Sequence, residues 1–313
     1  MNQALDVLLH TLPIIFLIAL GTVTRHARLI SPEALEDIKK IIVYISLPAM
    51  LFLTFASTTL VLSHLVIIAV MIALCSMMLL AGIRVFYRLS PDNPIFPGLF
   101  SGYEAGMMGY ALFATFFGAS ELYAFAIVDL GQVVFVFLIL TMFLHKRTGD
   151  QASLKKLAKK FFLSPVILAI IVGIFLSVTS LYQRSLDLRI SDAFIRTLEL
   201  AGALTQPLIC IVIGYELKLK AKNMKTALFT VALRLSVMVT LAWLIATFVF
   251  IRMLNLDPIF TTALYAMLIL PPPFVLPIFA QKADPKHRAQ ISDILSLHVI
   301  GSLLAYMVMV YIV

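Results

Sequence analysis

The stretch Ala266–Ala280, AMLILPPPFVLPIFA, decides the fold of this chain. It lies in an apolar segment long enough to cross a bilayer, yet Pro271, Pro272 and Pro273 have no backbone N–H, and a proline ring clashes with the preceding helical turn. Pro272 and Pro273 also push the residues before them out of the α region. A helix through this segment must break near its middle. A break at membrane depth is stable only inside protein or beside a polar cavity, which is typical of transporter binding sites.

The composition of the whole chain indicates a membrane protein. Of its 313 residues, 62% are hydrophobic and 13% are charged, whereas soluble domains are about 45–50% apolar and about 25% charged. We therefore predict an all-α, polytopic membrane protein, with residues 1–313 as a single transmembrane domain and no soluble catalytic domain. The net charge of +8 then reflects loops that face anionic lipid, and nucleic acid is not expected as a partner.

Ten apolar segments follow one another along the chain. Their expected ranges are 8–24, 38–57, 63–84, 94–117, 121–144, 161–181, 193–216, 227–251, 258–280 and 290–312. The odd-numbered loops between them carry 19 of the 24 Lys and Arg residues. Because positively charged loops stay in the cytoplasm, we predict a multi-pass protein of the inner (plasma) membrane with both termini periplasmic or extracellular.

Three short patterns recur in the same order in both halves of the chain. At offsets of 152, 159 and 164 residues, Pro13 and Gly21 match Pro165 and Gly173, Ser46-Leu47-Pro48 matches Thr205-Gln206-Pro207, and Asn93-Pro94-Ile95-Phe96 matches Asp257-Pro258-Ile259-Phe260. Five spans is an odd number, so the second half must enter the membrane upside down. The patterns predict an inverted 5+5 repeat, 1–145 and 161–313, joined by a basic cytoplasmic loop, 146–160.

Four interruptions are expected near the membrane midplane, because each lies about ten residues or slightly more into its span, roughly half of a 30 Å core. The substrate-binding candidates at these interruptions are Ser46, Pro48, Tyr103, Gly106, Gly109, Thr205, Gln206, Pro207, Pro271, Pro272 and Pro273. The fourth and ninth spans are predicted to form a pair of broken helices whose half-helix N-termini bind an anion. The alternative is that these prolines and glycines only kink and pack helices.

Ionisable residues at membrane depth are costly and usually functional. Glu104, at the break of the fourth span, is the first candidate for binding a coupling proton or cation; the alternative is a carboxylate that caps the broken helix or is paired internally. Asp129 and Gln132 are three residues apart and share a helix face. They are predicted to join the same ion-coupling site or, alternatively, to form a buried hydrogen-bonded pair.

Two further ionisable residues have competing interpretations. Arg234 lies about two turns into the eighth span, and snorkelling toward the cytoplasmic interface is preferred over an inward orientation that would attract a carboxylate. His298 is expected to be a satisfied packing residue rather than a proton relay. Cys75 and Cys210 fall inside spans and are expected to be small core residues.

Several functional motifs are absent from the sequence. It has no phosphate-binding loop, no His-Glu-x-x-His metal motif, no Gly-x-Ser-x-Gly element and no paired-cysteine metal or haem motif. Neither a cofactor nor an enzymatic activity is therefore expected.

The chain resembles the auxin efflux carrier family of bacterial permeases over essentially its full length. The features that carry the resemblance are Leu12-Pro13-Ile14-Ile15 in a span ending at Gly21, the run Ser46-Leu47-Pro48-Ala49-Met50-Leu51-Phe52, the ten-span count, and Leu270-Pro271-Pro272-Pro273. Members are similar in fold to sodium/bile-acid and sodium/proton antiporter-type carriers. The resemblance implies two inverted five-helix repeats, fourth and ninth spans that cross, elevator-like transport and a homodimer.

The resemblance also implies a substrate class. Members move organic anions such as malonate, malate or auxin-like carboxylates. Relatives often have asparagine at the fourth-span break, where this chain has Gly102-Tyr103-Glu104-Ala105-Gly106; this departure favours proton coupling through Glu104. The expected function is a secondary active transporter driven by the membrane potential or a proton gradient. The alternatives are a channel and a membrane receptor or scaffold without transport.

Overall fold

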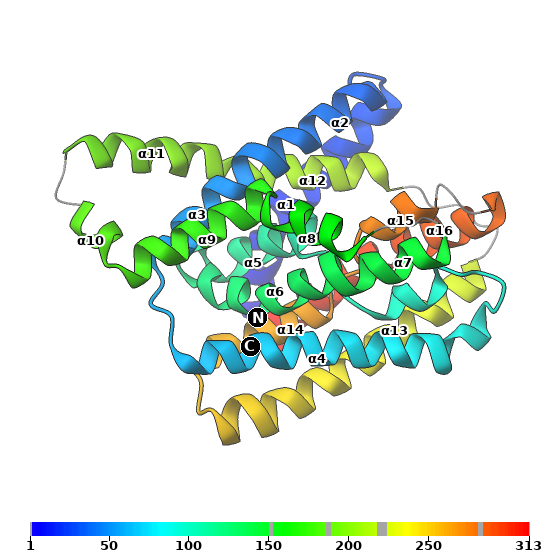
Figure 1. Ribbon diagram of the computed structural model, residues 1–313. Helices are drawn as coiled ribbons and strands as arrows, with labels where there is room; N and C mark the ends of the chain where they lie inside the picture. Colours follow the sequence, from blue (N-terminus) through cyan, green and yellow to red (C-terminus); the bar gives the residue numbers. More distant parts are fainter. Residues whose placement is uncertain (1, 150–152, 186–188, 218–223, 281–283, 313) are drawn as a thin grey trace. The chain divides into compact units, whose positions relative to one another are not determined.

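The computed structural model describes residues 2–149, 153–185, 189–217, 224–280 and 284–312, and these are helical with short connections (Figure 1). Within them, six helices are long and apolar enough to cross a membrane, or seven if Lys155–Phe162 and Pro165–Val178 form one bent span. The other three expected spans coincide with shorter apolar helices, Leu12–His26, Ala105–Phe117 and Pro258–Leu268. The structure is therefore that of a polytopic helical protein, while the count of ten spans stays a prediction. Lys218, Lys220, Lys222 and Lys282, which support the predicted orientation, lie outside the described residues.

The chain forms two compact units. Unit 1 comprises residues 1–64, 106–126 and 160–217, and unit 2 comprises residues 65–105, 127–159 and 218–313. The helices of unit 1 are α1 (Asn2–His26), α2 (Pro32–Ile41), η1 (Ile42–Ser46), α3 (Leu47–Ser57), α5 (Tyr110–Phe117), η5 (Ala119–Glu121), α9 (Pro165–Val178), α10 (Leu181–Ser185), α11 (Arg189–Ala203) and α12 (Thr205–Glu216). Those of unit 2 are η2 (Phe86–Leu89), η3 (Phe96–Phe100), η6 (Phe135–Leu140), α7 (Thr141–Arg147), α13 (Met224–Ile245), η8 (Ala246–Met253), α14 (Pro258–Leu268), α15 (Val275–Ala280) and α16 (Pro285–Ile312). Residues of α4 (Leu62–Arg84), η4 (Ala105–Gly109), α6 (Leu122–Val134) and α8 (Leu154–Phe162) belong to both units.

Glycines bring the helices of unit 1 into backbone contact. A Cβ on Gly21 of α1 would lie 2.0 Å from the carbonyl oxygen of Ile211 in α12, and one on Gly173 of α9 would lie 2.8 Å from that of Phe52 in α3. The paired helices α3 and α9 run beside each other in Figure 1. Small residues that allow such close approach are typical of membrane helix packing.

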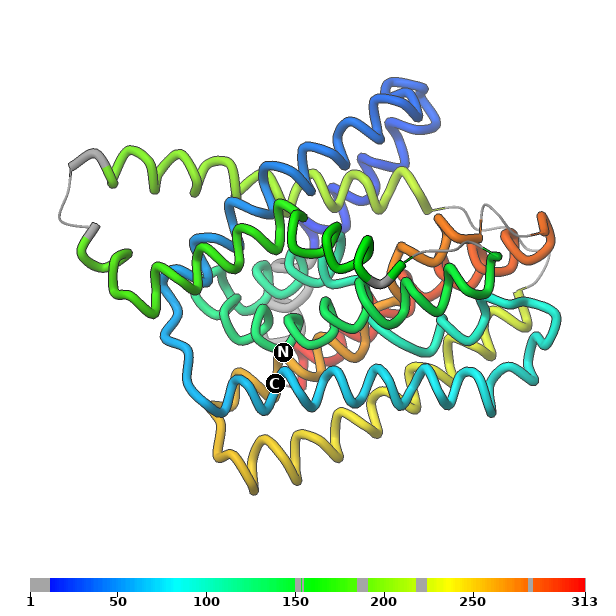
Figure 2. Tube along the Cα trace, viewed as in Figure 1, coloured from blue at the N-terminus to red at the C-terminus, as the bar shows by residue number. Residues whose placement is uncertain are grey.

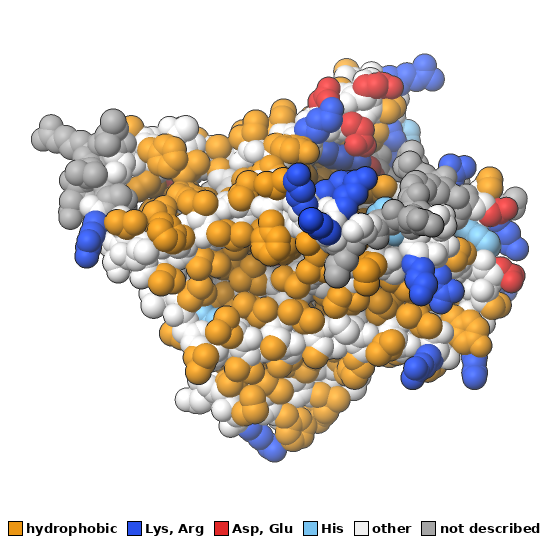
Figure 3. All heavy atoms as spheres, in the orientation of Figure 1, with side chains coloured by type: hydrophobic (Ala, Val, Ile, Leu, Met, Phe, Trp, Pro, Cys, Tyr) orange, Lys and Arg blue, Asp and Glu red, His pale blue; other side chains and the backbone are white. Residues whose placement is uncertain are grey.

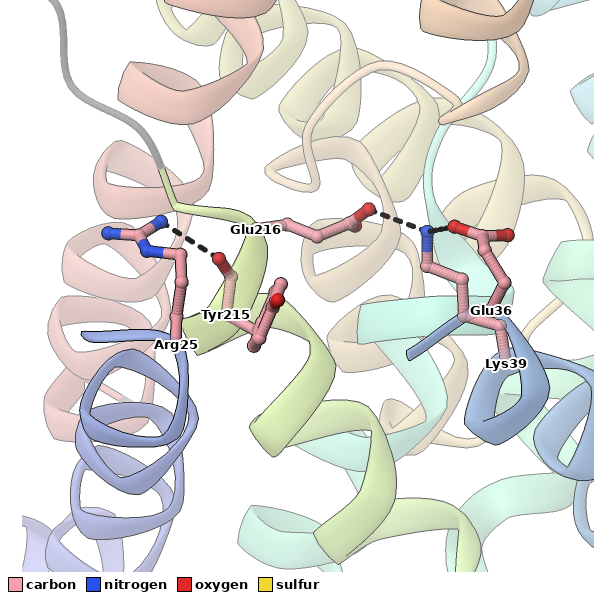
Figure 4. Close-up of polar contacts among 5 residues, drawn as sticks. All are labelled: Arg25, Glu36, Lys39, Tyr215 and Glu216. Carbon is pink, nitrogen blue, oxygen red and sulfur yellow. Dashed lines mark hydrogen bonds and ion pairs between the residues drawn. The ribbon is translucent and has the colours of Figure 1, made fainter. Parts of the chain in front are cut away.

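One end of α12 is held by charged side chains from two other helices (Figure 4). Arg25 of α1 donates to the carbonyl oxygens of Tyr215 (2.8 Å) and Leu217 (2.5 Å). Lys39 of α2 lies 2.8 Å from Glu36 and 2.6 Å from Glu216. The arginine satisfies carbonyls that the helix end leaves without an intrahelical partner, and its positive charge complements the negative end of the helix dipole.

The prediction that Ser46-Leu47-Pro48 interrupts the second span is wrong. Residues Pro32–Ser57 form one helical span of 26 residues, and Figure 2 shows the trace of this blue segment running on without a break. The turn before the proline, Ile42–Ser46, is π-helical. A widened turn accommodates the missing N–H and the ring of Pro48, so the helix bulges instead of ending.

The outer faces of helices in unit 2 are apolar. Leu65 and Leu80 of α4 and Phe248 of η8 are exposed over 60%, 53% and 50% of their surface. Hydrophobic side chains cover the lower part of the face seen in Figure 3, where α4 lies in the same view of Figure 1. Such surfaces are expected where lipid surrounds a helix.

Candidate functional site

The proline triplet breaks the ninth span as predicted from its chemistry. Helix α14 begins at Pro258, capped by the Asp257 carboxylate, which accepts from the N–H of Ile259 at 2.9 Å, and it ends at Leu268. Helix α15 begins only at Val275. Because three consecutive prolines donate no backbone hydrogen bond, the carbonyls before and within the triplet need partners from elsewhere.

The partner of the triplet is the broken segment of the fourth span. After η3, the chain turns at Gly102, whose φ is +68°, and a Cβ there would lie 2.8 Å from Cγ of Pro273. The Glu104 N–H donates to the Pro271 carbonyl at 2.9 Å, and the Phe274 N–H donates to the Glu104 carboxylate at 2.5 Å. Two breaks 170 residues apart thus bond each other through both backbone and side chain.

Asp129 and Gln132 of α6 support the same segment. The Gln132 amide oxygen accepts from the Tyr103 N–H at 3.2 Å, and its NH₂ donates to Asp129 at 2.8 Å. Both side chains are buried. The shared face predicted from their spacing therefore lies against the fourth-span break, and the two residues also form a hydrogen-bonded pair.

Arg234 of α13 is the third contributor, and the preferred interpretation that it snorkels is wrong. Its side chain is only 1% exposed. One terminal nitrogen donates to the carbonyl oxygen of Leu99, and the other donates to those of Gly102 (2.8 Å) and Leu270 (3.5 Å). The guanidinium also lies over the Tyr103 ring, 5.3 Å from its centroid. The carbonyls freed by the two breaks offer it better partners than the membrane interface does.

His298 and Ser302 of α16 bind the ninth-span break from another helix. The Ser302 hydroxyl donates to the Ile269 carbonyl at 2.6 Å, and His298 Nδ1 lies 3.1 Å from the same hydroxyl oxygen. Since the hydroxyl proton is already donated, Nδ1 must carry the proton of the neutral imidazole. Nε2 is then the acceptor; it is buried and has no hydrogen-bond partner, so the expectation of a satisfied packing histidine holds for only one ring nitrogen.

The other substrate-binding candidates belong to unit 1. Gly106 and Gly109 lie in η4, and Ser46 and Pro48 lie in the continuous second span. Thr205 and Pro207 open α12 after a single non-helical residue, Leu204. None of these residues takes part in the hydrogen bonds described above for the proline triplet.

The predicted interruption of the seventh span at Thr205-Gln206-Pro207 is also not a break: Ser191–Glu216 is one helical span of 26 residues with a single non-helical residue at Leu204, and it packs within unit 1. The Gln206 amide donates to the Thr115 hydroxyl of α5, while the Thr205 hydroxyl is buried without a hydrogen-bond partner. A Cβ on Gly202 would lie 3.3 Å from Met50 of α3. The seventh span thus meets the second span close to the positions that their matching patterns single out.

Two residues of the unit 2 cluster were not predicted, Ser302 and Met238; Met238 lies 3.1 Å from the Tyr103 hydroxyl. Ser302 follows His298 by four residues and so shares its helix face, a signal that the sequence contains. Met238 has no such signal, because methionine is a common core residue. Both cysteines are free and buried, and the described residues contain no group of His, Cys, Asp and Glu that could hold a metal ion.

Apolar helices, two interrupted segments bonded to each other, and buried ionisable side chains together define a polytopic membrane protein of the transport class. The family described as membrane transport protein matches residues 6–310. The chain belongs to this family, the auxin efflux carrier family, which confirms the resemblance seen in the sequence. The family is one of transporters rather than enzymes. No curated protein matches the chain.

Proposed function

We propose that this protein is a secondary active transporter of small organic anions such as malonate, malate or auxin-like carboxylates. One observation carries the proposal: the four charged side chains that are buried in the described residues, Glu104, Asp129, Arg234 and Asp293, all belong to unit 2. Charges inside a membrane protein are expensive and mark substrate and ion pathways. Two of the four, Glu104 and Arg234, bond the broken segments directly.

The balance of these charges supports coupling to a proton. The set contains three carboxyl groups and one guanidinium, so an added organic anion would raise the buried negative charge unless a carboxyl group is neutralised. We propose Glu104 as the group that takes the proton, with Asp129 and Gln132 completing the ion-coupling site. Its carboxylate accepts the Phe274 N–H, so protonation would alter a bond between the two breaks.

We further propose ten spans in an inverted 5+5 repeat, with the fourth and ninth spans crossing. The glycine contacts of unit 1 support the repeat: Gly21 meets Ile211 and Gly173 meets Phe52. An offset of 152 residues relates Gly21 to Gly173, and an offset of 159 residues relates Phe52 to Ile211. These are the offsets that relate the sequence patterns. The first span therefore meets the seventh as the sixth meets the second, as an internal two-fold relation requires.

For the mechanism we propose elevator-type alternating access with unit 2 as the moving body. Unit 2 contains the proline triplet, residues 102–105 of the fourth-span break and the four buried charges, and each unit has its own dense internal packing. A location in the inner membrane with periplasmic or extracellular termini, and assembly as a homodimer, complete the proposal. The lysine and arginine distribution supports the orientation.

The test is uptake of labelled malonate, malate and indole acetate by vesicles that contain the purified protein, with and without a pH gradient. Uptake of at least one anion, increased by the gradient, is expected. Absence of uptake under every gradient contradicts the organic-anion proposal. Conductance far above carrier rates would indicate a channel, and binding without flux would indicate a receptor.

Replacement of Glu104 by Gln tests the coupling step. The amide keeps an oxygen for the Phe274 N–H but cannot carry the coupling proton, so uptake should lose its dependence on the pH gradient. Glu199→Gln is the matched control because Glu199 is exposed on α11, and it should leave that dependence unchanged. A gradient effect that persists in Glu104→Gln excludes Glu104 from coupling.

A further inference from the structure

Each of the two broken segments presents carbonyl oxygens that have lost their helical partners. Leu99 belongs to the last turn of η3, and Leu270 follows the end of α14 by two residues. The C-terminal end of a helix carries partial negative charge. Two such ends side by side would repel an organic anion from the place where the two breaks meet.

Arg234 is bonded to both of these ends at once. Its guanidinium donates to Leu99 and Gly102 from the fourth span and to Leu270 from the ninth. The planar fork of arginine can reach several acceptors in fixed directions, which a lysine ammonium does less well. One side chain thus caps both segments and ties them together.

The Arg234 side chain makes its contacts with backbone carbonyls and with the Tyr103 ring. The Nε of Arg234 is buried without a hydrogen-bond partner. Among the described residues Arg234 is also the one buried Lys or Arg. The two terminal nitrogens are bonded to protein carbonyls, and the guanidinium lies over Tyr103, so the side chain is not free to bind a substrate directly.

We infer that Arg234 is a positioning residue that determines charge preference: it neutralises the carbonyl ends of both broken spans and makes the adjoining space accept an organic anion, without contacting that anion. The anion preference rests on the proposed function, whereas the capping of the two breaks does not. Charge and geometry are separable, since lysine retains the charge without the fork, and glutamine retains two donors without the charge.

The first experiment measures malonate uptake by vesicles containing the parent, Arg234→Lys, Arg234→Gln or Arg252→Gln. Arg252 is exposed on η8, which continues α13, so its replacement removes the same charge from the same helix. We expect Arg234→Gln to raise the KM for malonate at least tenfold. Arg234→Lys should keep the KM within about threefold while Vmax falls, because the ammonium cannot reach all three carbonyls, and Arg252→Gln should change neither.

Two results overturn the charge preference: an unchanged KM in Arg234→Gln, or an equal rise in KM in Arg234→Lys and Arg234→Gln. A parent that moves no organic anion contradicts the proposed function instead. The capping role is then still tested through Cys75, whose fully buried thiol lies against the backbone of Gly102.

The second experiment follows maleimide labelling of Cys75 in a Cys210→Ser background. Loss of the cap should loosen the segment around Gly102, so Arg234→Gln should label at least tenfold faster than the parent and Arg252→Gln at the parental rate. Equal labelling rates in the parent and Arg234→Gln overturn the capping role. This measurement needs no substrate. The labelling rate of Arg234→Lys is expected to lie between those of the parent and Arg234→Gln.

Discussion

Units 1 and 2 are both packed through glycines, but they differ in what lies at their centres. In unit 1, Gly21 and Gly214 bring α1 and α12 into backbone contact, and the charged contacts of Arg25 and Lys39 lie at one end of α12. In unit 2, Gly82 and Gly131 make similar close approaches, yet the centre contains broken backbone and buried charge. Close packing alone can stabilise continuous helices, whereas a broken span needs side-chain partners for its freed backbone groups.

The largest effect is expected from Gly214→Ala. The added Cβ would lie 1.8 Å from the carbonyl oxygen of Ile18, and backbone cannot move aside as a flexible side chain can. Helices α1 and α12 must separate, so folded protein recovered in detergent should fall severalfold and the apparent melting temperature should drop by about 10 °C or more, as for a change of several kcal/mol.

Gly301→Ala is the matched control for that change. A Cβ at Gly301 of α16 would meet side-chain atoms of Val231 and Leu235 at 3.3 and 3.5 Å, so a shift of a few tenths of an ångström in a side chain accommodates it, with no backbone atom in the way. Its melting temperature should stay within about 3 °C of the parent, consistent with a change below about 1 kcal/mol. Equal losses in both variants would show that glycine packing is equally demanding everywhere.

Glu104→Ala should have the next largest effect, now in unit 2. It leaves the part-buried Phe274 N–H without the carboxylate acceptor seen at 2.5 Å, at a cost of about 1–3 kcal/mol. Thermal unfolding should show this loss, while Glu104→Gln should recover most of it through the amide oxygen. Two variants of equal stability would mean that the bond between the breaks contributes little.

Ser302→Ala tests the contact of α16 with the same break. The Ile269 carbonyl would lose its hydroxyl donor and His298 Nδ1–H its acceptor, with an expected loss of about 1–2 kcal/mol. The comparison variant is Ser236→Ala, at an exposed position of α13, which should unfold at the parental temperature. A silent Ser302→Ala would indicate that the broken span does not depend on this hydroxyl.

The smallest effect is expected from Lys39→Met in unit 1. Lys39 contacts Glu36 and Glu216 and is 23% exposed, and ion pairs of this kind contribute about 0–1 kcal/mol, less at high salt. Lys40→Met should produce no measurable change, because Lys40 and its partner Asp37 are 68% and 69% exposed. A larger loss of unfolding free energy in Lys39→Met than in Glu104→Ala would show that the charged contacts of unit 1 matter more for stability than those at the breaks in unit 2.

Several features of the fold could be predicted because their causes are local. Prolines lack an N–H wherever they occur, so the break at Pro271–Pro273 follows from three adjacent residues. The i, i+3 spacing of Asp129 and Gln132 placed them on one face, and they are hydrogen bonded at 2.8 Å. The break at Pro48 was wrongly predicted because the alternative, a π-helical turn at Ile42–Ser46, depends on how the surrounding helix relaxes.

Hydropathy and proline chemistry act within a few residues, so they are sufficient to predict a polytopic helical membrane protein and the location of its central break. The quoted motifs indicated the auxin efflux carrier family. The direction in which Arg234 points follows only from the folded protein. A long flexible side chain can reach either the interface or the interior, and the choice depended on three carbonyl oxygens from Leu99, Gly102 and Leu270. Those residues are distant in the chain, and they meet only when both broken spans have folded together.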